Sequence, residues 1–359
     1  MSGHDDDCAD GTVSRRKFLA TAAATVATGG ALAGCTRQAE TRVPKPTEAQ
    51  KAGKRKSDSP IAIVRCESYD QDIFSLVKPF LKDLDLPDLK GKVVMLKPNM
   101  IDVIPGKPTV TAPAVITAVF ELISHLGAKD IFVGEGPAHN RDTERLLVSS
   151  GHGAVYKKLG LKFVDLNLDD LQMVDNINGF ADIDKWYLPK TAVEADYIVS
   201  IPKLKTHHWA RLTCSMKNMY GCAPGRRYGW PKNVLHYKGI DNCALDLTRV
   251  LKPAIQFVDA VVAMEGDGPI NGSAKNANFV LVGTDPAAVD STCARIMGID
   301  PMNVPYLKAA GDVIGHIDPN YIKVFGLVVG SVTSPFQPAP PFDVSGKSIK
   351  LEDANSASS

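Results

Sequence analysis

Residues 197–240, on which the rest of the chain is organised, read YIVSIPKLKTHHWARLTCSMKNMYGCAPGRRYGWPKNVLHYKGI. This stretch opens with Tyr197-Ile198-Val199-Ser200-Ile201, an apolar run that is typical of a buried strand. A long polar segment begins with Pro202-Lys203 at the carboxyl end of that strand. Because ligand crevices of open α/β sheets lie at such strand ends, the stretch predicts a ligand site in an α/β protein.

The charge of this stretch indicates which kind of ligand to expect. It contains no aspartate or glutamate, although the whole chain carries 40 acidic residues and 41 lysines and arginines. A segment with this imbalance creates a positive potential that attracts anions, and the alternative is a solvated basic face. We expect an anion site, because a buried strand delivers the charges. The basic residues are Lys203, Lys205, Arg211, Lys217, Arg226, Arg227, Lys232 and Lys238, accompanied by His207, His208 and His236.

Apolar runs on both sides of the stretch alternate with helical patterns. This alternation predicts one α/β domain over residues 60–330, with a mainly parallel, doubly wound (Rossmann-like) sheet, helices on both faces and the basic stretch as a long insert. Strands are expected at residues 61–64, 92–97, 130–133, 162–165, 186–188, 195–201, 255–264, 278–282 and 322–329. Helices are expected at residues 72–84, with a kink at Pro79, and at 111–125, 144–149, 154–159, 241–251, 286–297 and 304–310.

Two acidic loops follow strands of the predicted sheet. Glu135 lies between two glycines after one strand, and Glu265-Gly266-Asp267 follows another. Carboxylates at strand ends bind a divalent metal, act as a general base or pair with nearby lysines, and the structural alternative is a tight turn with solvated acids. Their similar positions favour one shared site opposite the basic stretch. We therefore predict Glu135, Glu265 and Asp267 as metal ligands.

Three further motifs complete the predicted site. Lys97-Pro98-Asn99 ends a buried strand, where a lysine either serves catalysis or caps a neighbouring turn. Lys217-Asn218 offers a cation and an amide, which suit a bound carboxylate or phosphate. Nearby lysines favour the neutral form of His207, which suits a base or a metal ligand. The predicted catalytic residues are Lys97, Glu135, His207 and Glu265, and the predicted substrate-binding residues are Asn99, Lys203, Lys205, Lys217, Asn218 and Arg226.

The N-terminal sequence predicts export. Arg15 and Arg16 belong to a twin-arginine pattern, and the weakly hydrophobic run after it is too short and too polar to span a bilayer. Leu32-Ala33-Gly34-Cys35 matches a bacterial lipobox, so we expect a signal peptide over residues 1–34 and a lipid anchor on Cys35. The alternative is cleavage after Ala33 and release. The expected partners are the twin-arginine translocation machinery and the membrane, and the expected location is periplasmic or extracytoplasmic, as a membrane-anchored lipoprotein.

Composition distinguishes both ends of the chain from the predicted domain. Residues 35–59 have few large apolar side chains and are expected to form a disordered tether, and residues 331–359 form a Pro- and Ser-rich tail. The net charge of +1 argues against a general nucleic-acid binder, so no nucleic-acid partner is expected.

The cysteines limit which cofactors the chain can hold. Of seven, two precede the predicted mature domain, and the remaining five include no Cys-x-x-Cys pair. A Cys214–Cys222 disulfide is one alternative after export, and buried thiols are favoured for Cys66 and Cys293. The wide spacing of Cys214, Cys222 and Cys243 disfavours an iron–sulfur cluster. The cofactor therefore stays open, with a divalent metal ahead of an iron–sulfur cluster.

Together these motifs resemble a family known as "domain of unknown function 362". The resemblance covers residues 61–329 and rests on Lys97-Pro98-Asn99, Gly134-Glu135-Gly136, Pro202-Lys203-Leu204-Lys205-Thr206-His207, Lys217-Asn218 with Gly221, and Gly283-Thr284-Asp285-Pro286-Ala287-Ala288-Val289-Asp290. The resemblance implies the domain and not a reaction. Some members carry appended ferredoxin-type iron–sulfur modules, which implies a redox setting for those members, and this sequence has no such module.

The sequence is compatible with three functions. The first is an exported, membrane-tethered enzyme that acts on an anionic small molecule at a pocket of Lys, His and Glu side chains, with or without a metal. The second is a protein that binds an anion or cofactor without chemistry. The third is an electron-transfer partner whose cysteines ligate a cluster.

Overall fold

The computed structural model describes residues 43–137, 142–176 and 179–349. The predicted signal peptide, with Arg15, Arg16 and Cys35, lies outside the described residues, as do the first residues of the predicted tether. None of the helices in the described ranges combines the length and the apolar composition that a membrane crossing requires.

A large central sheet organises the described chain. Its strand order is β12 (Ile322–Gly326), β1 (Ser59–Arg65), β11 (Ser273–Gly283), β10 (Ile255–Glu265), β7 (Tyr197–Ile201), β2 (Val93–Pro98), β3 (Asp130–Glu135) and β4 (Lys162–Asp165). Neighbouring strands are parallel except at β11, which runs antiparallel to both β1 and β10. The mainly parallel α/β fold is therefore confirmed. A separate antiparallel pair, β5 (Leu171–Asp175) and β6 (Lys185–Pro189), contains the strand expected at 186–188.

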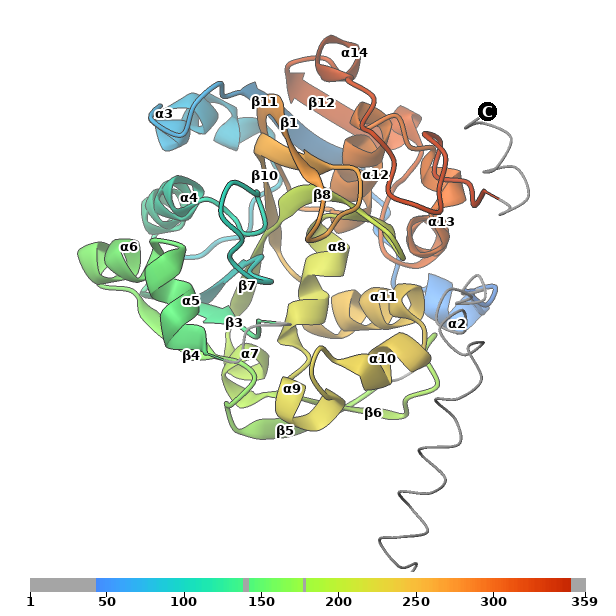
Figure 1. The fold of residues 1–359 in the computed structure, drawn as a ribbon, viewed down its shortest axis with the longest axis horizontal. Coiled ribbons are helices and arrows are strands. Elements are labelled where there is room, and N and C mark those ends of the chain that lie inside the picture. The colour runs from blue at the N-terminus through green and yellow to red at the C-terminus, as the bar shows by residue number, and fades with distance from the viewer. Residues whose placement is uncertain (1–42, 138–141, 177–178, 350–359) are drawn as a thin grey trace, which may run out of the picture. The chain divides into compact units, whose positions relative to one another are not determined.

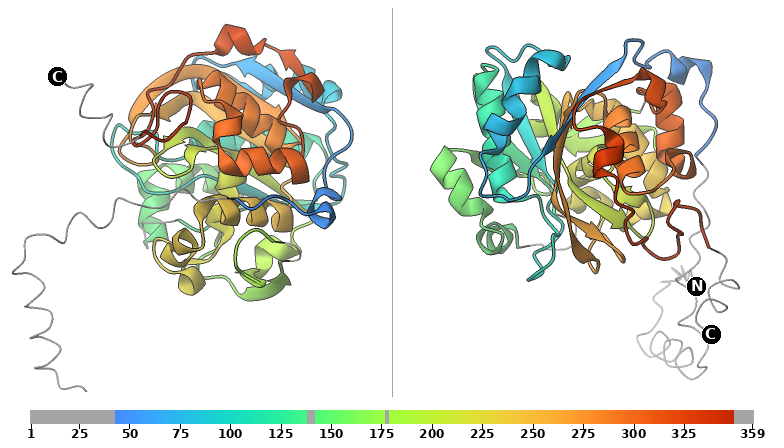
Figure 2. Two further views of the ribbon diagram at one scale, coloured as in Figure 1. Left: turned by 90° about the vertical axis from the view of Figure 1, so that its right-hand side faces the viewer. Right: turned by 90° about the horizontal axis from the view of Figure 1, so that it is seen from above.

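Helices cover both faces of this sheet (Figures 1 and 2). Strand alternation assigns side chains to two cores: Val94 and Leu96 belong to one, and Met95 between them belongs to the other. One face carries α3 (Ile73–Val77), α4 (Pro113–His125), α5 (Thr143–Ser149) and α6 (His152–Leu159). The other carries α8 (Ser215–Asn218), α11 (Ile240–Leu251), α12 (Pro286–Ile296) and α13 (Pro305–Val313).

The helix expected at residues 72–84 differs from the observed structure. An α-helix ends at Val77, and a 3₁₀ helix continues from Lys78 to Asp83. Pro79 lies in the first turn of this 3₁₀ helix, because its missing N–H and its ring disrupt a continuing α-helix. The remaining short elements are α2 (Glu48–Lys51), α7 (Lys190–Glu194), α9 (Gly225–Tyr228), α10 (Asn233–Tyr237), α14 (Val329–Val332) and 3₁₀ turns at Met219–Cys222, Pro301–Asn303 and Pro319–Tyr321.

The strand that opens the basic stretch is followed by a second strand that the sequence does not indicate. After Pro202 the chain continues as β8 (Lys203–His207), which pairs with the second half of β10 and with β9 (Arg211–Thr213). All five residues of β8 are buried. Lys203 and Lys205 therefore lie inside the sheet, whereas the prediction places them in a loop beyond it.

Both ends of the described chain pack more closely than their composition indicates. Helix α2 lies inside the predicted tether, and its Gln50 is buried. In the Pro- and Ser-rich tail, Phe336 and Phe342 are buried, and Phe336 joins the core on the α12 face. Aromatic side chains between the prolines supply the apolar surface that holds the tail against the domain.

Candidate functional site

A pocket of about 160 Å³ lies beyond the carboxyl ends of β2, β3 and β8. The chain proceeds from β2 to β3 and β4 on one side of the sheet and from β7 to β10 on the other, so the pocket lies at a topological switch point. The predicted crevice at the strand ends therefore exists. Its lining is Asn99, Met100, Ile101, Glu135, Gly136, His207, His208, Trp209, Thr213, Lys217, Asn218, Tyr220, Gly221, Pro231, Lys232, His236, Pro269 and Ile270.

Lys217 supplies a positive charge to this pocket. Its Nζ lies 4.2 Å from the centroid of the Tyr220 ring, a cation–π contact. Across the described part of the chain, this ammonium group has no hydrogen-bond acceptor and no carboxylate partner. Burial lowers the pKa of Lys217 to about 8, and nearby Asp241 opposes that shift. A cation in this position favours the binding of an anion.

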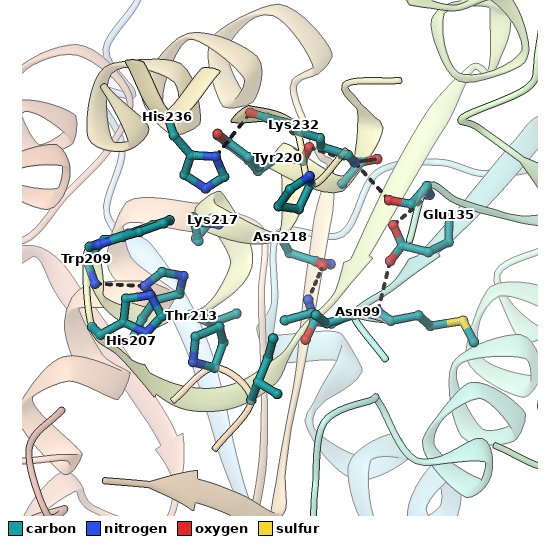
Figure 3. Close-up of a pocket in the computed structure, with 18 residues that line it drawn as sticks. Asn99, Glu135, His207, Trp209, Thr213, Lys217, Asn218, Tyr220, Lys232 and His236 are labelled. Carbon is teal, nitrogen blue, oxygen red and sulfur yellow. Dashed lines mark hydrogen bonds between the residues drawn. The ribbon is translucent and has the colours of Figure 1, made fainter. Parts of the chain in front are cut away.

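Three polar side-chain atoms in the same lining are buried and have no hydrogen-bond partner within the described residues. They are Asn99 Oδ1, Thr213 Oγ1 and Tyr220 OH, on side chains that are 8%, 2% and 6% exposed. Figure 3 shows Lys217 between Trp209 and His207 on one side and Asn99 and Glu135 on the other. Because buried polar groups are normally hydrogen-bonded, this concentration indicates a site built for a polar ligand.

The hydrogen bonds of His207 fix which of its nitrogens carries the proton. Its Nδ1 accepts from the backbone N–H of Trp209 at 3.0 Å and of Ala210 at 3.2 Å. The proton of the neutral ring is therefore on Nε2. Burial lowers the pKa of His207 well below its usual value, and Lys217 and His208 lower it further. His207 is thus a neutral hydrogen-bond donor, which differs from the predicted base or metal ligand.

His236 has the opposite arrangement. Its Nδ1 lies 3.1 Å from the carbonyl oxygen of Lys232, which can only accept, so Nδ1 carries the proton and Nε2 the lone pair. His208 has the same tautomer, with Nδ1 2.8 Å from the carbonyl oxygen of Gly268. The rings of both histidines lie 4.7 Å from that of Trp209 in edge-to-face contacts. His236, which the sequence interpretation did not select, therefore has an acceptor nitrogen at Nε2, where His207 has a donor.

An ion pair between Lys97 and Glu135 supports the pocket. Lys97 Nζ donates to Glu135 Oε2 at 2.7 Å, and both side chains are almost fully buried. Glu135 also accepts from the backbone N–H of Met100 and of Gly136. A Cβ on Gly221 would lie 2.5 Å from Glu135 Oε1 and 2.6 Å from Lys97 Nζ, so only glycine allows the chain to pass here.

Lys232 is a second lysine that the sequence interpretation did not select. Its ammonium donates to the carbonyl oxygens of Gly136 at 2.8 Å, Gly221 at 2.9 Å and Tyr220 at 3.4 Å. Burial lowers its pKa to about 7, and Glu135 opposes this shift. Because three carbonyls use its three donors, Lys232 holds the pocket loops together and does not present its charge to a ligand. Only its membership in the basic stretch marked it in the sequence.

Asp290 fixes the helix that carries Lys217. Helix α8 has no N-terminal cap of its own, and the Asp290 carboxylate on α12 accepts from the backbone N–H of Ser215 at 2.8 Å and of Met216 at 3.0 Å. Burial raises the pKa of Asp290 to about 6. This capping contact orients Lys217 from below the pocket.

Three of the predicted substrate-binding residues lie outside the pocket. Lys203 Nζ is 2.5 Å from Asp259 Oδ2 inside the sheet. Lys205 Nζ donates to the carbonyl oxygen of Thr109, and burial lowers the pKa of Lys205 well below its usual value. Arg226 is exposed and donates to the carbonyl oxygen of Leu168. Asn99, Lys217 and Asn218, the other three, do line the pocket.

The predicted set of acidic metal ligands does not come together. Glu265 Oε2 lies 3.1 Å from Lys275 Nζ and accepts from the backbone N–H of Gln337. Asp267 lies 3.8 Å from His208 Nδ1, and only Glu135 lines the pocket. In residues 43–137, 142–176 and 179–349, no three His, Cys, Asp or Glu side chains form a group that could hold a metal ion. The two acidic loops therefore do not form the shared metal site that the sequence predicts.

The five described cysteines are buried free thiols. The Cys214–Cys222 disulfide is therefore absent from the described structure. Burial raises the pKa of Cys222 to about 11 and that of Cys243 to about 12. Thiols in this state are poor ligands and poor nucleophiles.

The sequence is similar to a thylakoid-associated protein of Synechocystis sp., with 26% identity over 225 residues, which cover 61% of this chain and 67% of that protein. A solved structure with partial similarity is the lactate racemase apoprotein from Thermoanaerobacterium thermosaccharolyticum, at 13% identity and a TM-score of 0.43; the match covers 71% of this chain and 61% of the length of the racemase. The family described as "Domain of unknown function (DUF362)" matches residues 94–295, more than half of the chain, and this range includes Lys97, Glu135 and Lys217. The chain therefore belongs to the DUF362 family.

Proposed function

We propose that the pocket binds a small anionic molecule and transfers a proton to or from it. The observation that carries this proposal is the Lys217 ammonium, which lies in the pocket without a hydrogen-bond acceptor or an ion-pair partner among the described residues. Desolvating a cation without a partner is costly, and a bound anion removes that cost. The pocket volume of about 160 Å³ suits a small molecule and not a macromolecule.

Two histidines support the proton-transfer part of the proposal. His207 presents a neutral Nε2–H donor, and His236 keeps the lone pair on Nε2. A fixed donor stabilises negative charge that develops on a reacting atom, and a base accepts the proton. A protein that binds the anion without chemistry would need Lys217 but would not need this division of roles.

Replacing Lys217 with methionine tests the binding step. The variant keeps the length of the side chain and removes the charge, so we expect the affinity for acetate and for inorganic phosphate to fall by about 10- to 100-fold, the range of a charge-assisted hydrogen bond. Isothermal titration of the full chain measures this loss. Lys157→Met changes an exposed lysine on α6 and should leave both affinities unchanged. Equal affinities in Lys217→Met and the wild type would refute the anion site.

The pH dependence of the same binding gives a second readout. Because the pKa of Lys217 is lowered to about 8, its ammonium persists below that pH and is lost above it, while an ordinary lysine stays charged. Acetate affinity should therefore fall above about pH 8, approaching tenfold per pH unit. The Lys217→Met variant should show no such fall. A fall that persists in this variant would assign the titration to another group.

The cellular location is a separate part of the proposal. The twin-arginine pattern at Arg15 and Arg16 and the lipobox cysteine Cys35 support export and anchoring by a lipid. Labelled fatty acid should enter the wild-type protein in cells and should not enter Cys35→Ala. Incorporation in both proteins, or in neither, would refute an anchor at Cys35.

A further inference from the structure

The orientation of the Asn99 amide is fixed by a chain of hydrogen bonds. Asn218 Nδ2 donates to the backbone carbonyl of Lys97 at 2.9 Å and to Ser200 Oγ at 3.1 Å. The Ser200 hydroxyl itself donates to the carbonyl oxygen of Ser215, so it can only accept from Asn218. Asn218 Oδ1 therefore faces Lys97 Nζ, at 3.4 Å, and Asn99. This order assigns the amide of Asn218 without ambiguity.

The fixed Asn218 amide determines what Asn99 offers to the pocket. Asn99 Nδ2 donates to Asn218 Oδ1 at 3.3 Å, which leaves Asn99 Oδ1 as a buried acceptor. The side chain lines the cavity and is 8% exposed, and no donor in the described chain reaches this oxygen. An oxygen in this position requires a hydrogen-bond donor, which a bound ligand can supply.

The charges around Asn99 indicate which donor fits. Lys97 Nζ contacts the Asn218 amide that binds Asn99, and Lys217 and Lys232 line the same pocket. Among the described lining residues, Glu135 is the one carboxylate, and it pairs with Lys97. A ligand ammonium would add a further cation to this group, and like charges at short range repel. A hydroxyl donates to Asn99 Oδ1 without that repulsion.

We propose that the anion of this pocket is a small hydroxycarboxylate, whose carboxylate binds Lys217 and whose hydroxyl donates to Asn99 Oδ1. This inference rests on the proposed function, because it needs the anion at Lys217. Thr213 and Tyr220 supply two further hydroxyl groups for the carboxylate oxygens. Asn99 is then the residue that selects hydroxylated ligands, and a carboxylate without a donor leaves its oxygen unpaired.

Matched ligands test the inference on the unmodified protein. Isothermal titration with acetate, glycolate and glycine compares a hydrogen, a hydroxyl and an ammonium on the same carboxylate. We expect glycolate to bind at least about tenfold more tightly than acetate, equivalent to about 1.4 kcal/mol, and glycine to bind more weakly than glycolate. Equal affinities for acetate and glycolate would overturn the inference. Tighter binding of glycine than of glycolate would also overturn it, because the ligand group at Asn99 Oδ1 would then be an amine.

A variant then locates the selectivity. Asn99→Leu has a similar volume and no acceptor, so the ratio of the glycolate affinity to the acetate affinity should fall to about one. Asn320→Leu, at an exposed asparagine in the 3₁₀ turn at Pro319–Tyr321, should keep the preference. A preference that persists in a folded Asn99→Leu protein would assign selectivity to another residue. If the wild type binds none of the three ligands, the proposed anion site fails; if it binds them equally and through Lys217, only the hydroxyl assignment fails.

Discussion

Replacing Glu135 with alanine is expected to lower the free energy of unfolding by about 3–5 kcal/mol, the usual cost of removing one partner of a buried ion pair. The variant leaves the Lys97 ammonium without its carboxylate, in a site where both side chains are at most 2% exposed. It also removes the acceptor of the Met100 and Gly136 N–H groups. Urea denaturation of the full chain measures the change.

The comparison with Lys97→Met makes this prediction specific. Without the lysine, Glu135 keeps two backbone N–H donors, so its charge remains partly stabilised and the loss should be smaller than in Glu135→Ala. Glu121→Ala, at an exposed glutamate on α4, should have little effect. A Glu135→Ala protein as stable as Glu121→Ala would contradict the assignment of this pair as the support of the pocket.

Replacing Asp259 with alanine is expected to cost as much stability, but at a different place in the fold. The Asp259 carboxylate accepts from Lys203 Nζ at 2.5 Å, from Tyr69 OH at 2.9 Å and from the Ala112 N–H at 2.8 Å. These three partners belong to β8, to the loop before α3 and to the start of α4. We therefore expect a loss of about 3–5 kcal/mol, with Lys203 left as an unpaired buried cation.

Controls separate this loss from ligand binding. Asp130→Ala, at an exposed aspartate on β3, should be close to the wild type in urea. Lys203→Met removes the buried cation, and Asp259 keeps Tyr69 OH and the Ala112 N–H as donors. This variant should therefore be less destabilising than Asp259→Ala. At temperatures where it stays folded, Asp259→Ala should still bind acetate, because neither Asp259 nor Lys203 lines the pocket. Loss of acetate binding in a folded Asp259→Ala protein would indicate that Lys203 is a ligand-binding residue.

The parts of the site that the sequence predicts correctly follow from the sheet. The sequence predicts Asn99, Glu135 and Lys217 because each follows a buried strand or lies in the basic stretch, and all three line the pocket. Parallel strands bring such positions to one edge, so the motif and the apolar run before it are sufficient to locate them. The mainly parallel α/β fold was predictable for the same reason.

Lys203 and Lys205 were assigned wrongly because a charge run does not reveal where its strand ends. Pro202 indicates the end of β7, yet the chain resumes pairing with β10 at Lys203. The partner of Lys203 is Asp259 on that neighbouring strand, 56 residues away in the sequence. A pairing over such a distance has no local signal, so a buried ion pair and a ligand-binding lysine look alike in the sequence.

Glu265 is a second residue whose partner the sequence does not indicate. Its position after a strand resembles that of Glu135, but β11 returns antiparallel beside β10 and brings Lys275 to it. The direction of β11 depends on the tertiary fold. The tautomers of His207 and His236 likewise depend on backbone groups that the sequence does not locate.

A crystal structure of the protein grown with glycolate would show whether Lys217 and Asn99 bind the ligand together. We predict the carboxylate in the pocket at the strand ends, with one oxygen within about 3.2 Å of Lys217 Nζ and the hydroxyl within the same distance of Asn99 Oδ1. Glycolate bound elsewhere, or a pocket without it at concentrations that saturate the titration, would contradict the assignment of Lys217 as the anion-binding residue.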